Sequence, residues 1–210
     1  MQSDEPTLPE SLEESLLRAG FSEDAGTTSL IRSSLESDQA RLRVLALRAG
    51  LRRSLIDAND WVRALDDADR DVRREALEMV ARANVDDPRI CDSILRLLDD
   101  ADPLVVDAAA FALGEHSHAP AVERLSLIAT GHDDARCRES AVAALGAIGD
   151  DRGRAAILAA LEDKPPVRRR AIVALTNFAG PDIDDALARA SEDRDWQVRA
   201  AVSQLAREEP

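Results

Sequence analysis

Apolar residues recur along this chain at a nearly constant interval. Each copy has an apolar position, here called the anchor, followed by apolar positions four, seven and eight residues later, as in Cys137, Ala141, Ala144 and Leu145. Such spacings place the side chains on one face of an α-helix. Successive anchors are 30, 30, 33, 32, 30 and 31 residues apart, and they are Leu12, Leu42, Val72, Val105, Cys137, Val167 and Val198. The pattern predicts a helix that is repeated along the chain.

A second helix is predicted in each copy. It opens with Pro or Asp and carries an apolar face aligned on Val62, Ile94, Leu125, Ile157 and Leu187. The glycines Gly114 and Gly146 are expected to end first helices in a left-handed conformation. No strand-like alternation occurs in the sequence. Because a single helix pair cannot bury its stripe but a stack of pairs can, we predict an all-α fold, a right-handed α–α superhelix of about six to seven repeats.

The same periodicity sets the expected domain organisation. Residues 1–9 are polar and acidic, and we expect a flexible segment there. Residues 10–207 are expected to form a single solenoid, with a degenerate repeat over 10–36 and a half-repeat from 193. The full repeats are expected to start near residues 37, 66, 99, 132 and 163.

Composition then limits the possible partners. The formal net charge is −14 and the pI about 4.6, which oppose binding to the phosphates of nucleic acid. Aromatic residues, which single-strand binding uses for stacking, are few, and they are Phe21, Trp61, Phe111, Phe178 and Trp196. Phe111 and Phe178 are expected in the core. Trp196 is expected either to cover the end of the stack or to anchor a contact.

Few residues are candidates for chemistry. Cys91 and Cys137 are far apart and form no zinc or disulfide pattern. His116 and His118 could bind a metal together with a third ligand such as His132, but nothing in their spacing requires such a site. The sequence contains no phosphate-binding loop and no nucleophile motif. We therefore expect no catalytic residue, no metal and no cofactor. With no apolar run of membrane-spanning length and no secretory signal, a cytoplasmic, non-membrane protein is expected.

Residues 144–163, ALGAIGDDRGRAAILAALED, resemble the short HEAT-like repeats of the phycobilin lyase type. The resemblance covers about residues 37–206 well. It implies a non-enzymatic scaffold that binds a protein or peptide. Two alternatives stay open: a bilin lyase-like chromophore-handling factor and, more weakly, a HEAT-like DNA-binding protein.

The resemblance also implies a ladder of aspartate and arginine between adjacent repeats. The residues that match it form the pairs Asp69/Arg73, Asp134/Arg138 and Asp195/Arg199. Two copies depart from this pattern, because Val106 replaces the arginine in one repeat and Lys164 replaces the aspartate in another. The ladder is therefore expected to be interrupted.

A candidate binding surface lies on the second helices, which line the concave side in solenoids of this kind. Asp60, Asp92, Glu123 and Asp185 fall at one aligned position, and we call them the acidic column. One interpretation is that they recognise a basic segment of a protein partner, with Arg96, Arg124 and Arg189 orienting carboxylates of that partner. The other is that they complement helix dipoles and stay solvated. The sequence leaves the oligomeric state open and favours a monomer.

Overall fold

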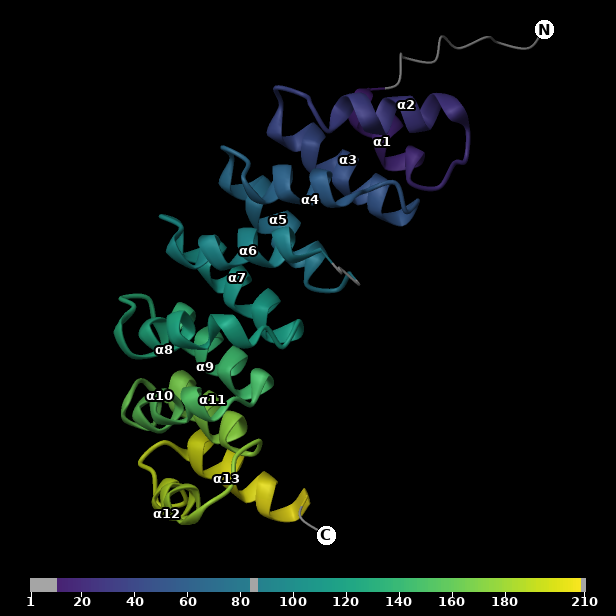
Figure 1. Ribbon diagram of the computed structural model, residues 1–210. Helices are drawn as coiled ribbons and strands as arrows, with labels where there is room; N and C mark the ends of the chain where they lie inside the picture. Colours follow the sequence, from purple (N-terminus) through teal and green to yellow (C-terminus); the bar gives the residue numbers. More distant parts are fainter. Residues whose placement is uncertain (1–10, 84–86, 209–210) are drawn as a thin grey trace, which may run out of the picture. The chain divides into compact units, whose positions relative to one another are not determined.

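The computed structural model describes residues 11–83 and 87–208, and within them every regular element is helical. The segment predicted to be flexible, 1–9, lies outside the described residues. The chain divides into two compact units between Ala76 and Leu77, inside one helix. The all-α repeat fold predicted from the sequence is confirmed (Figure 1).

The first unit contains two helix pairs and the beginning of a third. Its helices are α1 (Leu12–Ala19), α2 (Ala25–Ser34), α3 (Ala40–Arg52), α4 (Ala58–Leu65) and the first part of α5 (Arg70–Val80). Helix α3 packs on both α1 and α2. Ser11 opens α1 and Asp57 opens α4 with reciprocal capping boxes, which satisfy free backbone N–H groups of the first turn.

The second unit contains the rest of α5 and the remaining helices. They are α6 (Pro88–Arg96), α7 (Pro103–Glu115), α8 (Val122–Gly131), α9 (Ala135–Ile148), α10 (Arg154–Ala159), α11 (Pro165–Leu175), α12 (Pro181–Ala190) and α13 (Trp196–Glu208), with short 3₁₀ turns beside several of them. First helices α7, α9, α11 and α13 pack on one another in order, and α8 packs on α10. This unit thus has a row of first helices and a row of second helices (Figure 1).

The predicted apolar stripe forms the core between the rows. In α9 the anchor Cys137 and the stripe residues Ala141, Ala144 and Leu145 are all buried. Phe111, which was expected in the core, is 44% exposed, so that expectation was wrong. It lies six residues after the anchor Val105, outside the spacings that face the core.

The glycine prediction was also wrong, and the reason is close packing. Gly114 and Gly146 lie inside α7 and α9, and a Cβ on Gly146 would stand 2.7 Å from the Cα of Ala174. A Cβ on Gly114 would stand 2.9 Å from the Cα of Ala144. The left-handed cap of α9 is Gly149, with φ of 68°. The two helical glycines therefore let adjacent first helices approach each other.

Candidate functional site

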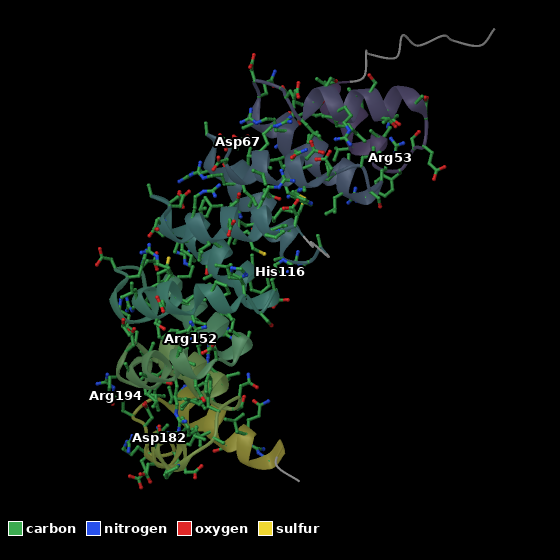
Figure 2. All side chains as sticks on the ribbon, viewed as in Figure 1. Arg53, Asp67, His116, Arg152, Asp182 and Arg194 are labelled. Atoms are coloured by element: carbon green, nitrogen blue, oxygen red, sulfur yellow. The ribbon has the colours of Figure 1, made fainter. Side chains whose placement is uncertain are left out.

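Arginines that are buried or half-buried connect successive repeats. Arg43 Nε and Nη2 donate to Asp67 Oδ2 and Oδ1 at 2.7 and 2.6 Å, in the first unit (Asp67 is labelled in Figure 2). Arg138 donates to Asp163 in the same two-bond geometry, at 2.5 and 2.7 Å, and Arg168 to Asp193 at 2.9 and 2.7 Å. Paired parallel hydrogen bonds of this kind fix both distance and angle. Each arginine thereby holds its repeat to the linker of the next.

The structure pairs the predicted ladder residues differently. Asp69, Asp134 and Asp195 are acceptors for backbone N–H groups at the starts of their own helices, at 2.9, 2.8 and 2.8 Å. Arg73 and Arg199 donate Nη1 to the backbone oxygens of Asp67 and Asp193, at 2.8 and 2.6 Å. The carboxylate that receives an arginine stands in the linker just before a helix-capping residue, as in Asp67-Ala68-Asp69. That spacing is visible in the sequence and could have identified the ladder.

These pairs make the stability of the fold depend on pH. Arg168 lowers the pKa of Asp193 and Arg138 lowers the pKa of Asp163, in both cases mainly through the side-chain hydrogen bond. A carboxylate whose folded pKa is depressed stabilises the fold above its unfolded pKa. That stabilisation is lost as the pH falls through the folded pKa.

We therefore expect the urea midpoint of unfolding to be nearly constant from about pH 7 to 5 and to fall below about pH 4. The variant Asp163→Asn/Asp193→Asn should show a lower midpoint at neutral pH and a shallower decline in acid. Asp92→Asn, which alters an exposed carboxylate, should keep the wild-type pH profile. An unchanged acid slope in the double variant would contradict this assignment.

The acidic column is only partly available for binding. Asp60 is buried, accepts Arg32 Nη1 at 2.5 Å and accepts the backbone N–H of Asp57 at 3.0 Å within the capping box of α4. The sequence alignment of the second helices placed Val62 at the core-facing position of α4. The residue that is buried there is Trp61, so the alignment of α4 is wrong by one residue. The carboxylate of Asp60 is therefore already bonded inside the chain, and a partner would have to compete with Arg32 for it.

The other three acids of the column are on the surface of the second unit. Asp92 on α6, Glu123 on α8 and Asp185 on α12 are exposed, and no hydrogen bond or ion pair within the described part of the chain holds their carboxylates. Of the arginines predicted beside them, Arg124 forms an ion pair with Asp99 and Arg96 donates to Ser93 Oγ at 3.1 Å.

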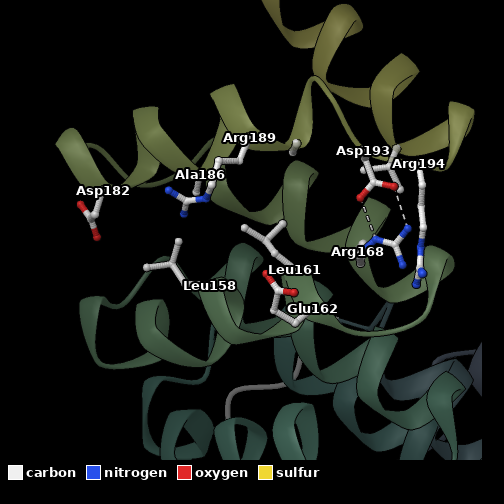
Figure 3. A pocket seen from close by; sticks show the side chains of 11 residues that line it. Leu158, Leu161, Glu162, Arg168, Asp182, Ala186, Arg189, Asp193 and Arg194 are labelled. Carbon is white, nitrogen blue, oxygen red and sulfur yellow. Dashed lines mark hydrogen bonds and ion pairs between the residues drawn. The ribbon is translucent and has the colours of Figure 1, made fainter.

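A groove of about 520 Å³ opens on the second helices between α10, its following 3₁₀ turn and α12 (Figure 3). Leu158, Leu161 and Ala186 supply apolar lining. Asp182 stands at one end and the Arg168–Asp193 pair at the other, with Arg189 between them. Of the three arginines predicted to orient a partner's carboxylates, Arg189 is exposed and lines this groove.

Sequence reasoning missed how the ends of this groove are built. Arg154 Nε donates to Asp182 Oδ2 at 3.0 Å, which connects α10 to α12 at one end. At the other end, Arg194 lines the groove beside Asp193 (both Asp182 and Arg194 are labelled in Figure 2). The two residues of each ion pair are 25 or more positions apart, so periodicity within one helix cannot pair them.

Cys137, His116 and His132 each contact a backbone group of the chain. Burial raises the pKa of the Cys137 thiol to about 11, and its Sγ lies 3.2 Å from the backbone oxygen of Pro103. His116 Nε2 lies 3.0 Å from the backbone oxygen of Val80, and His132 Nδ1 accepts the N–H of Asp134 at 3.0 Å. Among the residues that the structure describes, no three His, Cys, Asp or Glu side chains converge as a metal site requires.

Stacked helix pairs joined by arginine–aspartate pairs define a helical-repeat, α-solenoid protein. The chain belongs to the HEAT repeat family. The family model for HEAT repeats matches residues 58–146, 107–176 and 122–206, which together span more than half of the chain. No curated protein sequence matches it.

Solved structures show the same fold at low identity. A designed armadillo repeat protein in complex with the peptide (KR)4 is 17% identical, with a TM-score of 0.57 over 94% of this chain and 99% of that one. The YibA protein of Escherichia coli is 16% identical, with a TM-score of 0.62 over 94% of this chain and 75% of that one. An engineered protein is 21% identical, with a TM-score of 0.58 over 93% and 96%.

The helices are too short or too polar to cross a bilayer in the part of the chain that the structure describes.

Proposed function

We propose that this HEAT repeat protein is a non-enzymatic scaffold that binds a protein or peptide along the second helices of its second unit. The observation that carries the proposal is the groove between α10 and α12, which combines an apolar lining with charged ends. An extended segment could bury an apolar side chain on Leu158 and Leu161 while its charges meet those ends. Interfaces of this composition gain affinity from the apolar contacts and specificity from the charges.

The partner segment is proposed to be basic. Asp92, Glu123 and Asp185 are exposed on three second helices, and their carboxylates are free of internal pairs within the described residues. The protein's net charge of −14 adds long-range attraction for a cationic ligand. One protein of similar fold is recorded with the basic peptide (KR)4.

The test is binding of a fluorescein-labelled (KR)4 peptide to the whole chain, followed by fluorescence polarisation. The variant Asp92→Ser/Glu123→Ser/Asp185→Ser should bind about tenfold more weakly, because three exposed ion pairs at about 0.5 kcal/mol each contribute about 1.5 kcal/mol in total. The difference should shrink in high salt.

The matched control is Glu23→Ser/Asp38→Ser/Glu115→Ser, which removes the same charge from exposed residues outside the column. It should bind within about twofold of the wild type. Equal weakening of both variants, or no binding of the basic peptide by the wild type, would show that the column does not recognise a basic segment.

A further inference from the structure

A second groove lies on the row of first helices in the second unit. It has a volume of about 440 Å³ and is lined only by residues of α11 and α13, two helices that pack together. The lining residues are Arg169, Arg170, Val173, Trp196, Gln197, Ala200, Ala201, Gln204 and Leu205. No second helix contributes to it, so it is separate from the groove described above.

Its charge is opposite to that of the protein as a whole. Two arginines and no carboxylate line the groove, in a chain with 41 acidic and 27 basic residues. Arg170 Nη2 is held by Glu139 Oε1 at 3.4 Å. Arg169 is exposed and donates Nη1 to the amide oxygen of Gln197 at 3.2 Å. Arg169 thus keeps most of its five N–H donors for a ligand.

Its apolar flank is open to solvent. Trp196 is 67% exposed and Val173 47% exposed, whereas Ala201 and Leu205 pack against the core cluster of Ile172, Ala190 and Val198. Two thirds of the Trp196 side chain is therefore open to contact with a ligand. Tryptophan and arginine are the residue types that contribute most often to binding hot spots.

We propose that this groove binds an acidic peptide segment that carries an apolar side chain. A carboxylate of the segment accepts two N–H groups of Arg169, and the neighbouring apolar side chain packs against Trp196 and Val173. A guanidinium and a carboxylate match in this two-bond geometry, and a lysine would not provide it. The site therefore selects a ligand of opposite charge to that expected on the second helices.

A peptide fits the surroundings better than a nucleic acid does. Next to the groove, towards α9 and α7, the surface carries Glu139 and Glu115. A polyanion that continued along the first helices would meet these carboxylates, and it would have only two arginines to neutralise its phosphates. A short peptide places one or two carboxylates at the arginines and ends before the acidic residues.

The experiment uses the full chain and a fluorescein-labelled nine-residue peptide of Glu and Asp with a central leucine. Arg169→Gln and Trp196→Ala should each weaken binding by about fivefold to tenfold, as measured by polarisation. Arg136→Gln, on an exposed arginine of α9, is the charge-matched control and should change binding less than twofold. Helicity by circular dichroism should be unchanged in all three.

Tryptophan emission gives a second measurement. Trp61 is only 4% exposed, so Trp196 accounts for the emission that acrylamide quenches easily. The acidic peptide should protect this emission in the wild type, and the acidic-column triple variant should be protected equally. A peptide with serine in place of leucine should protect less.

Three outcomes would overturn the proposal. One is equal binding of the acidic peptide and of a version with lysine at every acidic position. Another is unaltered binding by both Arg169→Gln and Trp196→Ala. The third is tighter binding of a nine-nucleotide single-stranded DNA that depends on the same two residues, which would assign the groove to nucleic acid.

Discussion

Replacing the buried Arg168 by leucine is expected to destabilise the second unit by about 3 kcal/mol. The Arg168 side chain is 4% exposed, donates two hydrogen bonds to Asp193 and donates a third to the backbone oxygen of Asp163 at 2.7 Å. Its removal leaves a carboxylate that is only 15% exposed without its partner. Urea unfolding followed by circular dichroism measures the loss.

The adjacent arginine is the matched control. Arg169→Leu alters an exposed side chain and should change stability by no more than about 0.5 kcal/mol. In the double variant Arg168→Leu/Asp193→Leu, part of the loss should return, since no buried charge stays unpaired. Similar effects of Arg168→Leu and Arg169→Leu would refute the structural role given to Arg168.

Replacing Gly146 by alanine is expected to destabilise the protein by about 1–3 kcal/mol, although alanine favours helix more than glycine does. The new Cβ would lie 2.6 Å from the Cβ and 2.7 Å from the Cα of Ala174. Because one of these atoms is backbone, α9 and α11 would have to move apart. Thermal and urea unfolding would both report the change.

Gly131 provides the contrast, since it is also helical, at the end of α8, and a Cβ there would meet nothing within 4 Å. Gly131→Ala should therefore be neutral or stabilise by up to about 1 kcal/mol. If Gly146→Ala were as stable as Gly131→Ala, close approach of the first helices would not depend on the glycine.

The ladder illustrates how far sequence reasoning reached. The resemblance to HEAT-like repeats identified Arg73, Arg138 and Arg199 as ladder residues, each directly after an anchor, and Arg43 and Arg168 occupy the same position. The resemblance paired the three arginines with aspartates that cap their own helices. The carboxylates that the arginines bond stand about 25 residues further on, and only the stacking of one repeat on the next brings them within 3 Å.

The binding surface shows the same division. The position of Asp60 in the acidic column follows from aligning second helices by sequence, but a one-residue change of register buries its carboxylate beside Arg32. Likewise, Arg168, Arg169 and Arg170 are three identical neighbours in the sequence. Successive helical residues point about 100° apart, so one is buried in the ladder while the next two line the first-helix groove.

The sequence by itself determined that the chain is built of repeated helix pairs and which stripe is buried in α3, α7, α9 and α11, although the anchor Leu12 of α1 is 47% exposed. Those properties follow from local periodicity, since one helix face must leave water. Only the tertiary structure decided which charges are paired and which are exposed, why Gly114 and Gly146 are needed, and where the two grooves open. These depend on distances between residues of different repeats, which packing sets and no local pattern contains.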